Sequence, residues 1–198
     1  YFFRSEDHLD MVIADVSGHS VGPALFMVEA RSALRSQVNR VSSPSETLGE
    51  LNRFLFEDLD NADYFITLFY LQYDNINQQL KFANAGHPPP LLLSSSQKQC
   101  RQLDAEGMII GVRKDIVFEE KTLTLAKGDI LLLYTDGITE AENPEGDFFG
   151  LDRVSDIFIR YAQHSPDEII QALLTELKQF SGREVFNDDI TLMIFKRT

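Results

Sequence analysis

The sequence contains very few of the residues that several classes of protein need. Its 198 residues include a single cysteine, Cys100, and no tryptophan. One cysteine excludes a disulfide framework and any zinc or iron–sulfur site built from cysteines, and it is typical of a reducing compartment. A chain of this length can bury roughly 70% of its unfolded surface without such supports. We therefore expect a cytoplasmic protein that is stabilised by its hydrophobic core.

Long apolar runs and positive charge are also scarce. No uninterrupted apolar segment approaches the roughly 18 residues of a membrane-spanning helix, so no membrane partner is expected. There are 18 basic residues against 31 acidic ones, which gives a net charge of −13. Binding to a phosphate backbone needs patches of Lys and Arg, so a nucleic-acid partner is not expected either. The acidic excess either serves solubility alone or includes a cluster that binds divalent cations.

The sequence does contain a series of short apolar strands and two pairs of helices. Adjacent strands are joined by short polar turns, and regular strand–helix alternation is missing, so the sheets are expected to be antiparallel. Strands that are apolar on both faces predict stacked sheets with helices outside them, an α+β fold. The expected strands are residues 9–16, 65–73, 79–85, 91–93, 116–125, 130–135 and 188–196, and the expected helices are 22–41, 43–60, 151–162 and 165–180.

The chain is expected to form one domain over residues 1–198, because no repeat or interdomain linker interrupts it. It begins inside a strand-like stretch, Tyr1-Phe2-Phe3, without an initiating methionine. We therefore expect the domain to be truncated at its N-terminus, with part of its first strand missing.

Aspartates stand at the ends of three strongly apolar strands. Asp15 ends one strand, Asp136 ends another and precedes a glycine, and Asp188 with Asp189 begins the last. Taken singly, an Asp-Gly pair after a strand is usually only a turn, and Asp188 could be an edge charge or a cap. Three such positions in one small domain favour a shared carboxylate site.

Carboxylates without a set of cysteine or histidine ligands suit hard cations such as Mg²⁺ or Mn²⁺. Several carboxylates that lie close together repel one another unless a metal neutralises them. Two ions about 4 Å apart can share a bridging water, lower its pKa and bind phosphate oxygens. The pattern therefore points to hydrolysis of a phosphate ester.

The segment after Asp15 fits a phosphate site. Ser17 and Gly18 form a turn that leaves backbone groups exposed, and the helix expected from Gly22 would favour an anion at its N-terminus. The same pattern also fits a plain strand–turn–helix. His19 either donates a proton to a leaving group or is a polar loop residue. For His87, the preferred interpretation is that it anchors the proline-rich loop by hydrogen bonds; the other is that it faces the substrate.

Five segments also carry a resemblance to a known family. Together they resemble the bacterial SpoIIE/RsbU-type serine/threonine phosphatases, which belong to the metal-dependent, type 2C superfamily. The resemblance spans nearly the whole chain, with the motifs in order. The segments are 15–20 (DVSGHS), 65–70 (FITLFY), 82–93 (FANAGHPPPLLL), 128–141 (GDILLLYTDGITEA) and 187–192 (NDDITL).

The resemblance implies a four-layer fold, an antiparallel β-sandwich flanked by helix pairs, with two Mn²⁺ or Mg²⁺ ions at one end. It implies hydrolysis of phosphoserine or phosphothreonine in a protein. The usual substrate is a STAS-domain anti-anti-sigma factor in a partner-switching pathway. The helical hairpin over residues 22–60 resembles the element through which attached sensor or receiver domains switch such phosphatases. Such an upstream domain is therefore expected in the full-length protein, and a homodimer is compatible with it.

Carried onto this sequence, the resemblance assigns catalytic roles to three aspartates. Asp15 would bridge both metals, and the carbonyl of Val16 would reach one of them. Asp136 and Asp188 would each bind one metal, with Asp189 as a weaker candidate. Two further residues, Gly18 and His19, would have a substrate-binding or acid role.

The sequence departs from the family pattern in two places. The Gly-Gly-Asp motif that usually precedes the first Tyr/Phe-rich stretch does not occur in the 198 residues, and its aspartate would help to bind the second metal. Ser20 stands where the family usually has glycine, which matters only if that backbone adopts a positive φ.

Two other functions remain open. One is a non-catalytic, phosphatase-like module that binds a STAS-domain or sigma-regulatory partner without hydrolysis. The other is a metal-dependent phosphoesterase for small molecules, which the sequence supports poorly.

Overall fold

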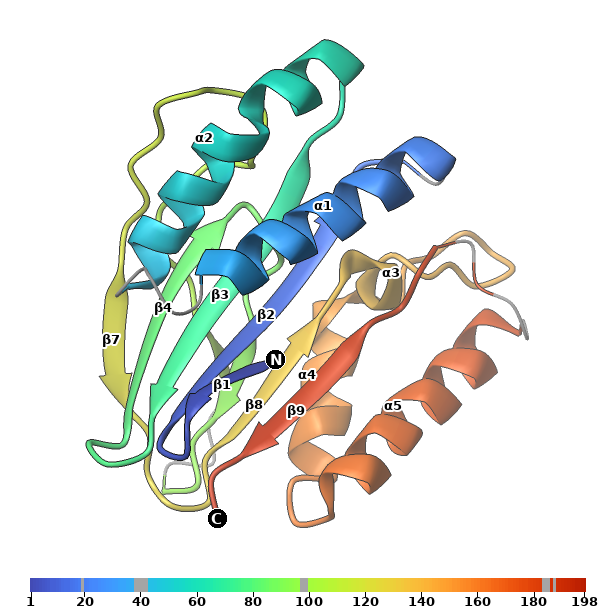
Figure 1. The fold of residues 1–198 in the computed structure, drawn as a ribbon. Helices are drawn as coiled ribbons and strands as arrows, with labels where there is room; N and C mark the ends of the chain where they lie inside the picture. Colours follow the sequence, from blue (N-terminus) through green and yellow to red (C-terminus); the bar gives the residue numbers. More distant parts are fainter. Residues whose placement is uncertain (19, 38–42, 97–99, 183–185, 187) are drawn as a thin grey trace. The chain divides into compact units, whose positions relative to one another are not determined.

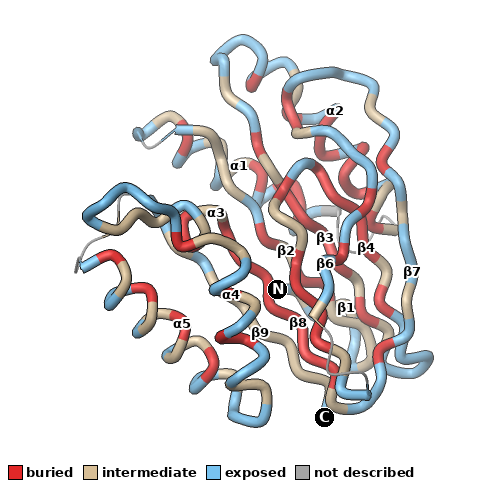
Figure 2. Tube along the Cα trace, turned by 180° about the vertical axis from the view of Figure 1, so that it is seen from behind, coloured by how far each residue is buried: buried red, intermediate tan, exposed pale blue. Residues whose placement is uncertain are grey.

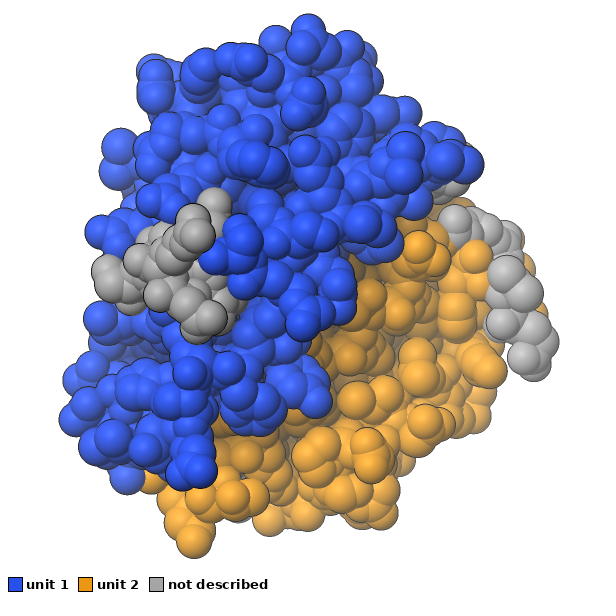
Figure 3. Space-filling view, viewed as in Figure 1, with its two compact units in different colours: residues 1–87, 104–125 blue, residues 88–103, 126–198 orange. Residues whose placement is uncertain are grey.

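The computed structural model describes residues 1–18, 20–37, 43–96, 100–182, 186 and 188–198. The chain divides into two compact units, which are coloured separately in Figure 3. Unit 1 comprises residues 1–87 and 104–125, and unit 2 comprises residues 88–103 and 126–198. Among the helices of the described part, none is long and apolar enough to cross a membrane.

Unit 1 contains a five-stranded antiparallel sheet in the order β1-β2-β3-β4-β7 (Figure 1). The central strands β2 and β3 pair along their whole lengths, from His8 opposite Asp74 to Val16 opposite Ile66. The bounds are β1 Phe2–Ser5, β2 His8–Val16, β3 Ile66–Asp74, β4 Gln79–Ala85 and β7 Lys121–Thr124.

Two helices belong to unit 1, α1 (Val21–Gln37) and α2 (Pro44–Ala62). The second helix was predicted to start at residue 43, and Ser43 does cap α2, since its hydroxyl accepts a hydrogen bond from the backbone N–H of Glu46 at 3.4 Å. The predicted apolar stripe of this helix is fully buried against the β3 face that carries Leu68 and Tyr70. That stripe is Leu48, Leu51, Leu55 and Leu59, and α2 accordingly has a buried side in Figure 2.

Unit 2 contains a four-stranded antiparallel sheet in the order β6-β5-β8-β9. Its core joins this sheet to two helices, with side chains such as Leu132, Phe158 and Leu173 fully buried. The elements are β5 Leu91–Leu93, β6 Cys100–Gln102, β8 Ile130–Tyr134, α3 Asp136–Thr139, α4 Gly150–Arg160, α5 Pro166–Ser181 and β9 Leu192–Lys196.

The predicted start of α5 is confirmed in detail. The Ser165 hydroxyl accepts from the Glu168 N–H at 3.3 Å, and the Glu168 carboxylate accepts from the Ser165 N–H at 2.9 Å. This reciprocal capping box satisfies two N–H groups that the helix itself leaves unpaired. The helix ends at Gly182, whose φ of 62° is one that glycine adopts readily.

Several predicted boundaries are wrong. Residues 116–120 are irregular and β7 begins only at Lys121, while residues 100–102, which were not among the expected strands, form the edge strand β6. Edge strands carry polar side chains because one side faces solvent, so the apolar signal was missing there. The last strand begins at Leu192 rather than 188, and the expected end of α1 at 38–41 lies outside the described residues.

Candidate functional site

Asp15 lies near the end of β2, in unit 1. It is half-buried, and its side chain is on the same face of the sheet as Met11 and Ile13, which are both buried. The alternate residues Val12 and Val16 pack against the core that contains α1 and α2. Since side chains alternate along a strand, Asp15 points to the face away from these helices. The sheet register thus fixes the direction of this carboxylate.

The carbonyl of Val16 points to the side of β2 away from β3. The next residue, Ser17, donates its backbone N–H to the Phe65 carbonyl at 2.9 Å, so these two form a hydrogen-bonded pair. In an antiparallel ladder such pairs alternate with pairs whose peptide groups point outward, and Val16 with its partner Ile66 is one of the latter. The register of β1 ends at Asp10, well before Val16. This geometry fits a carbonyl ligand.

The turn after β2 is closely packed. Gly18 has a φ of 90°, and a Cβ there would lie 3.3 Å from the Pro23 ring and 3.5 Å from the Tyr64 ring. Both the conformation and the space therefore favour glycine at this position. Ser20, which replaces the family's usual glycine, is exposed. His19 lies outside the described residues, and its role stays a prediction.

The preferred interpretation of His87 is confirmed, because its ring and backbone hold a buried network. Its ring Nδ1 lies 2.9 Å from the Thr67 hydroxyl oxygen. The His87 N–H donates to the Asn84 side-chain oxygen at 2.9 Å, and the Asn84 amide donates back to the His87 carbonyl at 3.1 Å. The same amide reaches the Asp104 carboxylate at 2.9 Å. His87 is only 2% exposed, so this network anchors the proline-rich loop at its start.

Unit 2 brings Asp136 close to the segment of Asp188 and Asp189 by hydrogen bonds of the neighbouring Thr135. Thr135 donates its hydroxyl to the Asp189 carbonyl at 3.1 Å and its N–H to the Thr191 carbonyl at 3.1 Å. Thr191 donates its own N–H to the Thr135 hydroxyl at 3.0 Å. The two candidate segments of unit 2 are therefore held side by side, although they lie about 50 residues apart in the sequence.

Gly137 shows how closely these two segments fit. A Cβ at this position would lie 2.4 Å from the Asp189 carbonyl oxygen, so any side chain would push the segments apart. Asp136 beside it is half-buried, whereas Asp188 and Asp189 are exposed. A cavity of about 270 Å³ adjoins them, and its lining includes Gly137, Glu140, Glu142 and Asp188. Asp136 and Gly137, which match the Asp-Gly of the family motif, therefore lie beside an acidic cavity in unit 2.

The structure describes the predicted ligands in two separate groups. Asp136, Asp188 and Asp189 are brought together within unit 2, while Asp15 and Val16 belong to unit 1. In the described ranges, no group of three or more His, Cys, Asp or Glu side chains forms a ready metal site. The donors present are carboxylates and one carbonyl, which are ligand types that Mg²⁺ and Mn²⁺ accept.

Cys100 can be set aside as a nucleophile. Burial raises the pKa of its thiol to about 11, and a hydrogen bond from Ser155 offsets this only in part. The thiolate is the reactive form, so the thiol stays protonated at neutral pH. This agrees with the lack of a cysteine-phosphatase motif in the sequence.

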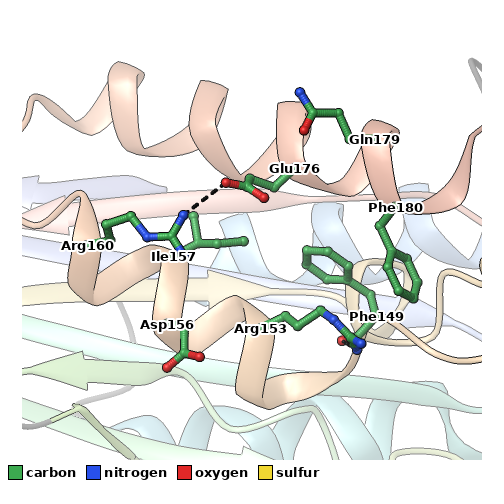
Figure 4. Close-up of a pocket in the computed structure, with 8 residues that line it drawn as sticks. All are labelled: Phe149, Arg153, Asp156, Ile157, Arg160, Glu176, Gln179 and Phe180. Atoms are coloured by element: carbon green, nitrogen blue, oxygen red, sulfur yellow. Dashed lines mark hydrogen bonds and ion pairs between the residues drawn. The ribbon is translucent and has the colours of Figure 1, made fainter.

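A second cavity, of about 330 Å³, lies between α4 and α5 (Figure 4). Two of the charged residues that line it, Arg160 and Glu176, form an ion pair at 3.0 Å. The Arg153 guanidinium lies 4.6 Å from the centre of the Phe180 ring and donates to the Phe149 carbonyl at 2.8 Å. The groups in this cavity therefore hold the two helices together, and they offer no arrangement for hydrolysis.

Comparison with known proteins connects these features to one family. The sequence profile of Stage II sporulation protein E (SpoIIE) matches residues 5–198. The chain is 28% identical over 197 residues to phosphoserine phosphatase RsbU of Bacillus subtilis, which covers 100% of this chain and 58% of that protein. It is 32% identical over 143 residues to phosphoserine phosphatase RsbP of the same organism, which covers 71% of this chain and 35% of that protein. The chain thus spans roughly a third to three-fifths of these relatives.

Solved structures show the same fold. The SiaA-PP2C domain of Pseudomonas aeruginosa superposes with a TM-score of 0.86 at 25% identity, covering 99% of this chain and 78% of that one. The PP2C phosphatase domain of SpoIIE from Bacillus subtilis gives a TM-score of 0.78 at 19% identity, covering 98% and 56%. The predicted α+β fold is therefore confirmed as PP2C-like. Taken with the profile match and the ordered motifs, this shows that the chain belongs to the SpoIIE family.

Proposed function

We propose that this chain is a metal-dependent protein serine/threonine phosphatase that hydrolyses phosphoserine or phosphothreonine. The observation that carries the proposal is the close fit between the start of α3 at Asp136 and Gly137 and the segment of Asp188 and Asp189, which leaves no room for a side chain at Gly137. A plain turn after a strand would not need this fit. The names of the relatives RsbU and RsbP support the same activity.

The proposed metal ligands are Asp15, the carbonyl of Val16, Asp136 and Asp188, with Asp189 as a weaker candidate. Several observations support this set: Asp15 and Asp136 are half-buried, and the Val16 carbonyl points away from the β3 ladder. Oxygen donors alone select hard ions, so Mn²⁺ or Mg²⁺ is proposed, with two ions in the intact domain.

Each residue in this set has a stated part in the reaction. When bound, the ions would lower the pKa of a water and neutralise phosphate oxygens. Asp15 is held by the register of β2, so its carboxylate needs little reorganisation to act as a ligand. Asp136 and Asp188 add negative charge from segments joined by backbone hydrogen bonds. Gly18 and His19 are proposed to contact the phosphate or to donate the proton that the leaving group takes.

The proposed substrate is a phosphorylated STAS-domain protein in a partner-switching pathway. The similarity to RsbU and RsbP supports this class of partner. Regulation is proposed through the hairpin of α1 and α2 by a sensor or receiver domain elsewhere in the full-length protein, and a homodimer is compatible with that. We place the reaction in the cytoplasm, in keeping with the single cysteine of the sequence.

The test is phosphate release from an aryl phosphate and from a serine-phosphorylated STAS-domain protein. The protein should carry whatever residues its gene places before Tyr1. We expect hydrolysis with Mn²⁺, none after chelation with EDTA, and loss of activity in Asp136→Ala. Asp156→Ala is the matched control, because Asp156 is an exposed aspartate of unit 2 on α4.

Two outcomes would count against the proposal. Hydrolysis that persists in EDTA, or in Asp136→Ala, would contradict the metal-dependent mechanism. A folded protein that hydrolyses neither substrate but binds the phosphorylated STAS-domain protein would favour the non-catalytic binding module. Hydrolysis of small phosphate esters with no action on the phosphoprotein would favour the small-molecule phosphoesterase.

A further inference from the structure

We propose that Thr67 and His87 are positioning residues for Asp15, which hold its carboxylate in the direction needed to bind metal. This inference rests on the proposed function, because it assumes that Asp15 is a metal ligand. All three residues belong to unit 1, so the argument uses one compact body. It also gives a role to two motifs, FITLFY and NAGHPPP, which the carboxylate ligands leave unexplained.

The register of the sheet puts Thr67 directly beside Asp15. The two residues are Cα partners in the antiparallel pair of β2 and β3. Residues directly opposite in such a pair project from the same face, with Cβ atoms about 4.5–5.5 Å apart. The next pair along this face, Ile13 with Phe69, is apolar. Thr67 is therefore a polar neighbour of Asp15 on this face, whereas the adjoining pair is apolar.

His87 fixes the orientation of that hydroxyl. Its ring Nδ1 is 2.9 Å from the Thr67 oxygen, and the residue is 2% exposed. A buried ring nitrogen needs a hydrogen-bond partner, so the contact is costly to break. The backbone of His87 is itself held from both sides by the Asn84 side chain. His87 is thus attached to the sheet at two points, by its ring to Thr67 and by its backbone to Asn84.

Asn84 ties this arrangement to the rest of unit 1. It lies on β4 opposite Phe69, and so on the same face of the sheet as Thr67. Its amide also donates to the Asp104 carboxylate, which accepts from the Ala105 N–H at 2.8 Å. A Cβ on Gly107 would lie only 1.9 Å from the Asn84 carbonyl oxygen, so the loop that contains Gly107 packs tightly against Asn84.

The chemistry of a hydroxyl explains how the pair would act. A threonine hydroxyl has one proton and two acceptor sites. If the His87 Nδ1–H donates to the Thr67 oxygen, the hydroxyl proton is left to donate to the neighbouring Asp15 carboxylate. That bond would fix the carboxylate rotamer before metal arrives. Loss of such a supporting partner typically costs 10–100-fold in metal affinity.

The experiment measures Mn²⁺ affinity by calorimetry in wild type, Thr67→Val and Thr67→Ser. Valine keeps the shape of threonine without its hydroxyl, and serine keeps the hydroxyl. We expect roughly tenfold weaker Mn²⁺ binding in Thr67→Val and affinity within about twofold of wild type in Thr67→Ser. Thr124→Val is the matched control, because Thr124 is an exposed threonine in the β7 edge strand of the same sheet, and it should bind like wild type. The electron paramagnetic resonance spectrum of bound Mn²⁺ should broaden or shift in Thr67→Val only.

A second pair of variants covers the case in which Thr67→Val does not fold. The amide nitrogen of asparagine stands where His Nδ1 does, so His87→Asn should keep most of the affinity and His87→Leu should lose about tenfold. Equal Mn²⁺ affinity in wild type and in folded Thr67→Val, or in both His87 variants, would overturn the inference while leaving the proposed function intact. Wild type that binds no Mn²⁺ would overturn the proposed function, and this inference with it.

Discussion

The two groups of candidate ligands are held in different ways. Asp15 in unit 1 is part of a regular strand, and its partner across the sheet, Thr67, contacts the buried His87 by a side-chain hydrogen bond. In unit 2, the segments that carry Asp136 and Asp188 are joined by hydrogen bonds of the Thr135 hydroxyl and backbone N–H, next to a glycine that has no space for a side chain.

This difference indicates which changes each group tolerates. Around Asp15, substitutions should act through the loss of individual side-chain hydrogen bonds, and isosteric replacements should reveal them. Around Asp136, substitutions should act through the fit of the backbone, because the contacts there involve carbonyl oxygens. The predictions below test this contrast, from the largest expected effect to the smallest.

The largest effect is expected from removing the charge of a proposed ligand. Asp15→Asn and Asp136→Asn should each lower Mn²⁺-dependent hydrolysis by more than about a hundredfold, since loss of a mere supporting partner already costs up to that amount. Asp189→Asn should cost much less. Steady-state rates on an aryl phosphate at saturating Mn²⁺ measure this. Comparable losses in all three variants would show that Asp189 is also a ligand.

Core substitutions test whether the two units unfold together. Leu51 of α2 and Leu173 of α5 are both fully buried, one in each unit. Either Leu→Ala change should lower the free energy of unfolding by about 2–5 kcal/mol. If residues 1–198 are a single cooperative domain, each variant should still unfold in one transition in urea. Two separate transitions in Leu173→Ala would show that the units are independent domains.

A pair of glycines tests the backbone fit in unit 2. Gly137→Ala would place a Cβ 2.4 Å from the Asp189 carbonyl, so we expect a loss of about 1–3 kcal/mol in stability together with a loss of hydrolysis. Gly146 has a φ of 88° but no atom within 4 Å of its missing Cβ. Gly146→Ala should therefore cost about 1–2 kcal/mol through backbone strain and leave hydrolysis intact. Full activity in Gly137→Ala would argue against a tight fit beside Asp136.

The smallest effect is expected at the helix caps. Ser165 and Ser43 both cap a helix by accepting an N–H, at 3.3 and 3.4 Å. Replacing either with alanine should lower the unfolding free energy by about 1 kcal/mol. The loss should be larger for Ser165, because its hydroxyl also donates to Glu168 at 2.7 Å. Thermal unfolding of the two variants provides the comparison, and a larger loss for Ser43→Ala would contradict it.

Much of the fold could be predicted because local patterns determine it. The apolar stripe of α2 and the Ser-Pro-x-Glu start of α5 depend only on neighbouring residues, and both are confirmed. The apolar runs also locate two strand ends closely: β2 ends at Val16, one residue after Asp15, and β8 ends at Tyr134, whereas Asp136 begins α3. The aspartates next to the ends of these apolar runs were also the source of the candidate ligands.

The rest depends on contacts between distant residues. The irregular segment before β7 is held by Asn52, whose amide donates to the Arg113 and Lys114 carbonyls at 2.8 Å each. The Asn52 side-chain oxygen accepts from the Gly111 N–H at 3.0 Å. In the sequence, this contact is indicated only by a polar residue, Asn52, on the apolar side of α2. The Thr67–His87 pair, 20 residues apart, was likewise invisible to periodicity.

The most direct test is to measure Mn²⁺ binding and hydrolysis together in wild type, Asp15→Asn and Asp136→Asn. One variant changes unit 1 and the other unit 2. The account predicts that wild type binds Mn²⁺ and hydrolyses the phosphorylated STAS-domain protein, and that each variant loses both properties while remaining folded by circular dichroism. Undiminished Mn²⁺ binding and hydrolysis in either variant would contradict the assignment of these carboxylates as metal ligands.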